Sequence, residues 1–306
     1  MIENSKTEVF KGHLAAIIVN IIYGLNINVS KSLFSSAWMT PIGLTMTRVT
    51  FTCVTYWIIS FFFPKEKISF RNQLFIGAAA FLGIIMGQAA FALALGLITP
   101  VTMSLISALN PFFILLLSVL FSIESISPIK VIGVITGISG TVLVVLNSKN
   151  NSISGINYFG LALALINVIS YSSHILIIRK MAGKMTPITM MKWMYLWSAI
   201  LLSPLGIPEL SKQRIFTSEI AALPALELAY TVLLSSLLGS FLMPVALKRI
   251  KATSVSMYMN FQPLAASAAA IIVGQDVFSW DKPLALLLIV TGVFIVTRSN
   301  WIHRND

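Results

Sequence analysis

Charged side chains are scarce in this chain. Asp, Glu, Lys and Arg make up 10% of its 306 residues, while 57% of the residues are hydrophobic. A soluble domain carries about 25% charged and about 45–50% apolar residues, so the shortage excludes an ordinary soluble domain and indicates an integral membrane protein. The net charge of +11 comes from short basic clusters between apolar runs, where such clusters orient a membrane protein. We therefore expect a lipid bilayer around the chain and no nucleic-acid partner.

Cysteine and histidine are almost absent as well. The single cysteine, Cys53, cannot form a disulfide within the chain and lies in an apolar run, so we expect it to pack as a small apolar side chain. The three histidines form no cluster, and neither paired embedded carboxylates nor a nucleophile–base pair occurs at helical spacing. We therefore expect no enzyme, no metal and no cofactor.

Long apolar runs fill most of the sequence. A membrane-spanning helix needs about 20 mostly apolar residues, and ten segments meet this length. They are roughly 12–34, 41–63, 73–95, 100–122, 128–147, 157–178, 187–206, 223–246, 252–273 and 282–298. The first lacks a clean cleavage site for a signal peptide, so we interpret it as a retained span.

The basic residues predict the orientation of the spans. With a cytoplasmic N-terminus, fourteen of the 21 Lys and Arg residues fall in cytoplasmic segments and five on the opposite side. The remaining two, Arg48 and Lys192, lie within predicted spans. By the positive-inside rule, both termini are expected to be cytoplasmic.

The two halves of the sequence resemble each other. At an offset of 152 residues the identical pairs include Gly87/Gly239, Pro111/Pro263 and Gly140/Gly292, and "MTPI" occurs at both 39–42 and 185–188. Five spans per half is an odd number, so the second half must enter the membrane upside down. The turn "ALALGLITP" has no charge and its counterpart "VALKRIKAT" has three, as inverted repeats require. We predict an all-α integral membrane protein whose ten transmembrane helices form two inverted five-helix repeats, residues 1–150 and 151–306.

Four stretches carry a resemblance to a known family. They are "YGLNINVSKSLF" in the first span, "LTMTRVTF" in the second, "ISALNPFFILLLSVLFSIESIS" from the fourth into the fifth, and "MNFQPLAASAAAIIVGQ" in the ninth. In order and spacing the chain resembles the ten-helix EamA type of the drug/metabolite transporter superfamily. The second copy has Gly274-Gln275 where the family often has Gly-Glu. The resemblance implies transport of a metabolite without specifying which one.

Matched amide–proline pairs interrupt the fourth and ninth predicted spans. Pro111 and Pro263 each remove a backbone donor, so we expect kinks that shape a central cavity and take part in gating; a static kink filled by helix packing is the alternative. Asn110 and Gln262 precede these prolines, and Asn260 and Tyr258 lie close by. The amides are candidates either for binding a polar substrate or for hydrogen bonding between helices.

Other polar residues inside the predicted spans complete the candidate site. Asn26 and Asn28 lie in the first span, and Gln88 lies in the third. Arg48 lies about 10 Å into the second span at 1.5 Å per residue, where it could clamp a carboxylate or a phosphate. No acidic residue lies deep in a span, so His174 is the only embedded candidate for proton coupling; an interfacial histidine is the alternative.

These features predict a secondary transporter of the cytoplasmic (inner) membrane. It would move a small polar or zwitterionic metabolite, amino acid-like or drug-like, by alternating access, and we expect it to be an exporter. A non-transporting membrane receptor or scaffold is the alternative. The sequence leaves a homodimer open.

Overall fold

The structure is a computed structural model that describes residues 2–98, 103, 106–107, 109–123, 126–147, 157–217, 221–272 and 280–302. Across these residues the regular elements are helical, apart from an isolated bridge between Ala182 and Met185. Up to residue 147 they are α1 (Ile2–Ser35), α2 (Pro41–Ser60), α3 (Phe70–Ala80), η1 (Phe81–Ala89), α4 (Ala90–Leu97), α6 (Asn110–Leu120) and α7 (Pro128–Asn147). From residue 157 they are α8 (Tyr158–Met181), α9 (Pro187–Leu210), α10 (Arg214–Thr217), α11 (Ala222–Ala229), η2 (Tyr230–Leu238), α12 (Gly239–Arg249), α13 (Ala252–Met257), η3 (Tyr258–Asn260), α14 (Phe261–Ile272) and α15 (Asp281–Ile302).

Five helical stretches of the described chain are long and apolar enough to cross a membrane. They are Lys6–Ser35, Pro41–Ser60, Phe70–Leu97, Tyr158–Met181 and Ala222–Arg249. Each coincides with a predicted span, which confirms the all-helical class. The other five predicted spans overlap α6, α7, α9, the run from α13 to α14, and α15, and the total of ten stays a prediction.

The repeated "MTPI" motif starts two helices in the same way. The Thr40 side chain accepts a hydrogen bond from the Gly43 amide (3.1 Å) at the start of α2. Thr186 accepts one from the Thr189 amide (3.3 Å) at the start of α9. Each threonine is an N-cap, and the proline that follows occupies the first turn, where a missing N–H costs nothing.

The two matched prolines lie near helix starts instead of in the middle of long helices. Pro111 is the second residue of α6, and Pro263 is the third residue of α14, directly after the 3₁₀ turn η3. Because Pro111 has no N–H, it leaves the carbonyl of Ser107 without its helical donor. The Asn110 side chain donates to that carbonyl at 2.7 Å, so the amide compensates for the proline that follows it.

A π-helical segment interrupts the same helix in each half. η1 lies between α3 and α4, and η2 lies between α11 and α12. They carry or adjoin the repeat partners Gly87 and Gly239. A switch from α to π pairing leaves carbonyls without their usual donors. Side chains of the opposite half supply donors: Asn167 binds the Gly87 carbonyl at 2.9 Å and Tyr56 binds the Leu237 carbonyl at 2.8 Å.

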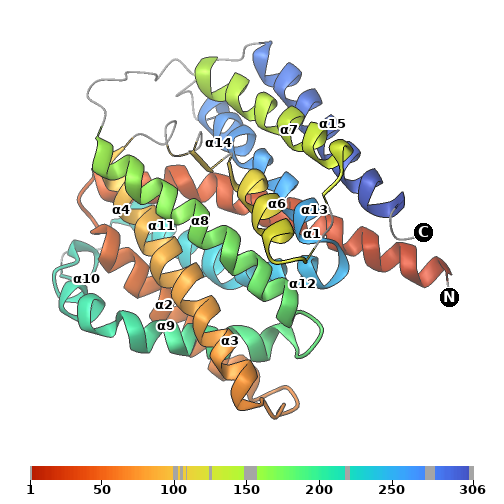
Figure 1. Ribbon diagram of the computed structural model, residues 1–306. Coiled ribbons are helices and arrows are strands. Elements are labelled where there is room, and N and C mark those ends of the chain that lie inside the picture. Colours follow the sequence, from red (N-terminus) through yellow and green to blue (C-terminus); the bar gives the residue numbers. More distant parts are fainter. Residues whose placement is uncertain are drawn as a thin grey trace.

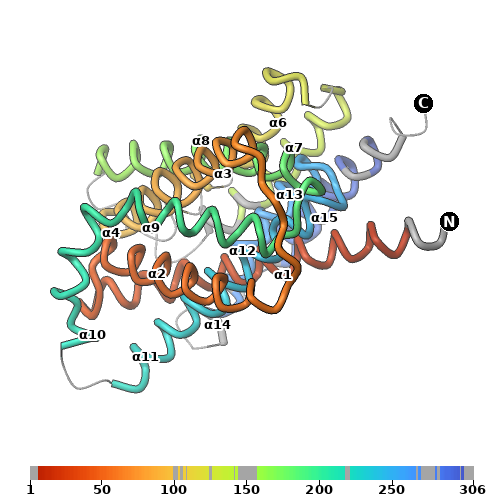
Figure 2. The backbone as a smooth tube through the Cα atoms, turned by 90° about the horizontal axis from the view of Figure 1, so that it is seen from below, coloured from red at the N-terminus to blue at the C-terminus, as the bar shows by residue number. Residues whose placement is uncertain are grey.

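The helices of the two halves pack reciprocally. The first long helix, α1, contacts η2, α12 and α14 of the second half, while its counterpart α8 contacts α4, η1 and α6 of the first. The helix α2 packs along α9, and α7 packs along α15 (Figures 1 and 2). The start of α1 and the end of α15 lie at the same end of the molecule in both views. This exchange of contacts is what a two-fold relation between the halves predicts.

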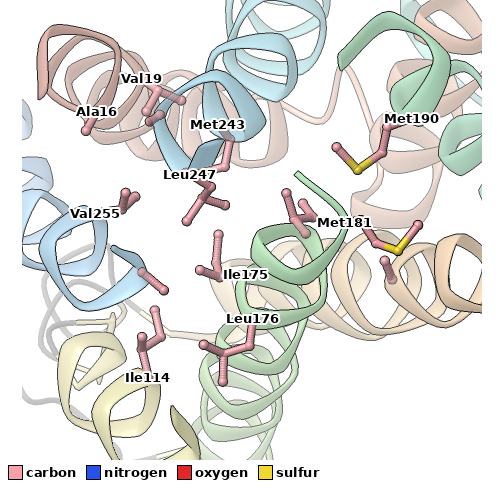
Figure 3. Packing of buried hydrophobic residues seen from close by; sticks show 14 of the residues in the cluster. Ala16, Val19, Ile114, Ile175, Leu176, Met181, Met190, Met243, Leu247 and Val255 are labelled. Atoms are coloured by element: carbon pink, nitrogen blue, oxygen red, sulfur yellow. The ribbon is translucent and has the colours of Figure 1, made fainter. Parts of the chain in front are cut away.

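The core lies where these helices meet. Buried apolar side chains of α1, α12, α13, α8 and α6 converge there, with Val19, Leu247 and Ile175 among them (Figure 3). At the contact between α7 and α15 the backbones approach so closely that a Cβ on Gly292 would lie 2.7 Å from the Gly133 carbonyl oxygen. A Cβ on Gly140 would lie 2.7 Å from the Ala285 carbonyl oxygen. Small residues permit this close packing between helices.

Candidate functional site

A cavity of about 90 Å³ opens between the two halves. Both halves contribute to it: α1, α2, η1, α4 and α6 from the first, and α8, η2 and α14 from the second. Most of its lining side chains are polar or aromatic. They are Tyr23, Asn26, Ile27, Arg48, Gln88, Phe91, Ser107, Asn110, Asn167, Tyr171, Ser235 and Gln262.

Five of the eight predicted binding residues line this cavity: Asn26, Arg48, Gln88, Asn110 and Gln262. They come from five different helical elements and are brought together only by the packing of the halves. The three other predicted residues lie outside the lining. Asn28 donates to the Ala266 carbonyl (3.2 Å), Tyr258 shares a hydrogen bond with His13 (2.8 Å), and Asn260 is fully buried beside Gly137.

Seven lining residues were not among the predicted binding residues, namely Tyr23, Ile27, Phe91, Ser107, Asn167, Tyr171 and Ser235. Asn167 had a usable signal, because it holds a place in the sixth predicted span similar to that of Asn20 in the first. Tyr23 and Ser107 lie in stretches that carry the family resemblance. The other apolar, aromatic and serine residues gave no signal, since such side chains occur throughout the spans and only the tertiary structure turns some of them to the cavity.

Arg48 is the charged group of the cavity. Its side chain is buried, with 7% of the residue exposed. Nε donates to the Ser236 hydroxyl at 2.6 Å, and an Nη2 hydrogen is donated to the Ser235 hydroxyl at 3.3 Å. Ser236 in turn donates to the Thr231 carbonyl five residues earlier (2.9 Å), which leaves its lone pairs for the arginine. Two adjacent serines of η2 therefore hold one edge of the guanidinium.

The other edge of the guanidinium has no carboxylate partner within the described parts of the chain. A guanidinium has five N–H donors in a planar fork, and the serines accept from two positions only. A buried cation without a counter-ion is costly unless an anion reaches it. The geometry therefore suits a carboxylate or phosphate that binds end-on to Arg48 from the cavity.

Two amide oxygens of the cavity have no donor in the described structure. The side-chain oxygens Oδ1 of Asn26 and Oε1 of Gln88 are shielded from solvent and accept no hydrogen bond. A buried acceptor without a donor costs free energy. Because both residues line the cavity, rotation of either amide would present its oxygen to a solute that carries N–H or O–H groups.

The repeat partners Asn110 and Gln262 make matching contacts. Gln262 of α14 donates to the Asn20 side chain of α1 at 2.9 Å, and Ser172 of α8 donates to the Asn110 side chain of α6 at 3.4 Å. Each amide thus lines the cavity and also forms a hydrogen bond with the first long helix of the opposite half. These contacts confirm the role in joining helices, and the lining position leaves the binding role of these two residues as a prediction.

His174 is not among the residues that line the cavity, although its ring stacks on that of Tyr171, which does line it. Its ring is buried against Gly83, and Nδ1 is 2.8 Å from the Ala79 carbonyl oxygen. The histidine bridges α8 to α3. Among the described residues no group of three or more His, Cys, Asp or Glu side chains could hold a metal ion.

The sequence model of the EamA-like transporter family matches this chain twice, at residues 10–146 and 158–298. The chain belongs to the EamA-like transporter family. It is therefore a multi-pass membrane protein of a family of transporters, with one copy of the family unit in each half. This confirms the resemblance seen in the sequence motifs.

A solved structure described as "Crystal structure of protein" has the same fold. It is 17% identical, with a TM-score of 0.73, and the match covers 95% of this chain and 96% of the other. At this identity the similarity establishes the fold alone. No curated protein matches the chain.

Proposed function

We propose that this EamA family member is a secondary transporter for a small polar metabolite that carries an anionic group. The observation on which this depends is the buried guanidinium of Arg48, held on one side by Ser235 and Ser236 and open to the cavity on the other. An anion that binds there supplies the missing counter-charge. The acceptors on Asn26 and Gln88 favour a second, hydrogen-bond-donating group on the same solute, as in an amino acid-like zwitterion.

Transport is proposed to follow alternating access. The two halves, residues 1–150 and 151–306, would be inverted repeats that rock around the cavity between them, with Pro111 and Pro263 at the helix breaks where the motion is taken up. The reciprocal packing of α1 and α8 and the paired π segments support this. Inverted repeats around a central site are typical of secondary transporters.

We propose further that the protein is an exporter of the cytoplasmic membrane. The basic residues favour an orientation with both termini in the cytoplasm. The lack of a deep acidic residue, together with the position of His174 outside the cavity lining, favours facilitated diffusion, exchange or weak coupling to protons. Proton-driven carriers usually place an ionisable group on the transport path.

Flux through proteoliposomes tests the proposal. Purified protein is reconstituted and loaded with a panel of labelled amino acids, nucleosides, phosphate esters, organic acids and amines. We expect saturable flux of at least one solute with a carboxylate or phosphate. Arg48→Gln should abolish that flux. Lys192→Gln should retain it, because Lys192 stacks on the Trp57 ring (4.8 Å) outside the cavity.

The receptor or scaffold alternative makes a different prediction. If a panel member stabilises the protein against heat while no solute crosses the membrane, the protein binds without transporting. Flux restricted to solutes without an anionic group would show that Arg48 has another role.

A further inference from the structure

Each copy of the "MTPI" motif contains a threonine, Thr40 or Thr186, that makes two kinds of hydrogen-bonded contact. Beyond capping its own helix, Thr40 contacts the end of α9, and Thr186 contacts the segment that follows α2. The partner residue therefore belongs to the opposite half in both cases. A helix cap alone needs no such partner.

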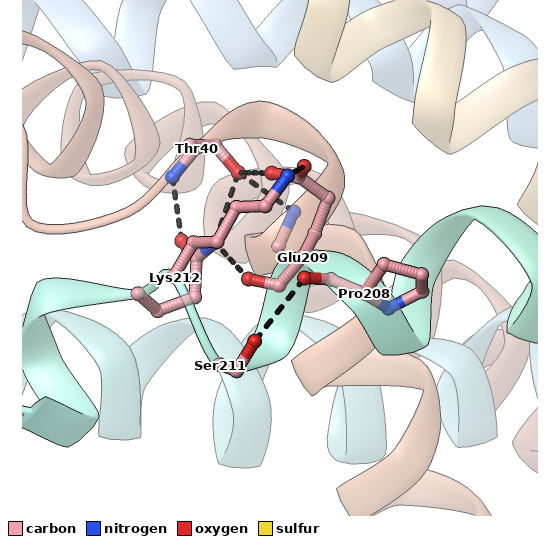
Figure 4. A network of polar contacts seen from close by, with 7 residues as sticks. Thr40, Pro208, Glu209, Ser211 and Lys212 are labelled. Carbon is pink, nitrogen blue, oxygen red and sulfur yellow. Dashed lines mark hydrogen bonds and ion pairs between the residues drawn. The ribbon is translucent and has the colours of Figure 1, made fainter.

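At the Thr40 end the contact is dense. The Thr40 amide donates to Oε1 of Gln213 (2.7 Å), and its hydroxyl donates to Oε2 of Glu209 (3.1 Å). Figure 4 shows Thr40, Glu209 and Lys212 drawn together there. Gln213 is 1% exposed and fits against Gly43, where a Cβ would lie 2.2 Å from its Cδ. Lys212 and Thr40 hold the pKa of the Glu209 carboxyl below its ordinary value, so the acceptor is ionised at neutral pH.

At the Thr186 end the contact is simpler. The Thr186 amide donates to both carboxylate oxygens of Glu66 (3.0 and 3.2 Å), and its hydroxyl donates to one of them (3.2 Å). Thr186 is exposed to solvent and Glu66 is partly exposed. The second contact is therefore the more easily broken of the two, because solvent competes for these donors.

The two contacts lie at opposite ends of one helix pair. The helices α2 and α9 run antiparallel, since Met46 lies against Gly206 near one end and Tyr56 stacks near Tyr195 toward the other. At 1.5 Å per residue the 20 residues of α2 extend over about 30 Å, close to the thickness of a bilayer core. Each contact therefore joins the two halves at a different face of the membrane.

We infer that Thr40–Gln213–Glu209 and Thr186–Glu66 are two latches, each of which closes the cavity toward one face of the membrane. The inference depends on the proposed function, because a latch matters only if the halves move. Side-chain hydrogen bonds between surfaces that separate are suited to this, since they form and break without rearranging the helices. Breaking one latch should shift the population toward the state open at that face.

Thiol accessibility in whole cells tests the inference without a known substrate. A single reporter, Ser107→Cys on the cavity wall, is placed in a Cys53→Ala background that removes the only native cysteine. A membrane-impermeant maleimide is added outside, and the labelling rate is measured. Detergent-permeabilised cells give the total reactive reporter. A monodisperse profile on size-exclusion chromatography confirms that each variant is folded.

Gln213→Ala and Glu66→Ala should change the labelling rate in opposite directions, each by about threefold, whichever way the chain is oriented. Thr40→Ser and Thr186→Ser are matched controls, because serine keeps the cap and the donor hydroxyl; they should label like the parent. Equal or same-direction changes, or a reporter that stays unlabelled from outside in every variant, would overturn the inference. If no solute is transported while the two variants still act oppositely, the latches stand and the proposed function fails.

Discussion

The two π segments η1 and η2 have similar backbones and different side chains. At an offset of 152 residues, Gly83 and Ile84 in η1 correspond to Ser235 and Ser236 in η2. In η2 the serines hold Arg48, while in η1 the glycine leaves room for the His174 ring. The same backbone therefore carries serines that hold a cation in η2, and a glycine that packs against the His174 ring in η1. The difference shows how two related halves can form a candidate site that is not symmetric.

The largest effect is expected from removing the cation that η2 holds. Arg48→Gln should weaken binding of an anionic solute by about 100-fold, because a buried charge pair is lost. Binding is measured by thermal-shift titration with a solute identified in the flux panel. Arg48→Lys should restore part of the affinity, since it keeps the charge without the planar fork. Unchanged affinity in Arg48→Gln would show that Arg48 does not bind the solute.

Copying the η2 serine into η1 should damage the fold. A Cβ on Gly83 would lie 2.0 Å from Nδ1 of His174, so Gly83→Ser should destabilise the protein by about 2–3 kcal/mol through overpacking. Thermal unfolding in detergent measures this. Adding His174→Ala should recover part of the loss, since it removes the clashing ring. If Gly83→Ser alone is as stable as the parent, the His174 ring can move from its position at little cost in free energy.

Within η2 the two serines should contribute unequally. Ser236 accepts from Arg48 at 2.6 Å and Ser235 at 3.3 Å. Ser236→Ala should therefore weaken anion binding by about tenfold and Ser235→Ala by about twofold. Ser236→Thr keeps the hydroxyl and serves as the control. Equal losses in both alanine variants would indicate that the arginine has no preferred partner.

The smallest effect is expected from removing the His174 ring, which packs against Gly83 of η1. His174→Ala should leave flux against an imposed pH gradient within about twofold of the parent, because the ring binds the Ala79 carbonyl and does not line the cavity. Proteoliposomes with a set internal pH provide the measurement. Complete loss of proton coupling would make His174 part of the transport path after all.

Most of the fold class could be predicted from composition and periodicity. Few charges and long apolar runs indicate membrane helices. The ends of such a helix can also be predicted where a capping sequence such as Thr40-Pro41 marks its start. The predicted second span, 41–63, corresponds to Pro41–Ser60. The residues that line the cavity were harder to predict. Polarity alone does not distinguish Asn26, which lines the cavity, from Asn28, which binds the Ala266 carbonyl.

The sequence by itself determined a helical membrane protein with two related halves, because hydrophobicity and repetition are properties of the chain alone. Only the tertiary structure decided which polar groups face one another. The serine edge around Arg48 and the contacts of both threonines with the opposite half join residues more than a hundred positions apart. Such pairs depend on how the two halves pack, and local periodicity carries no information about that packing.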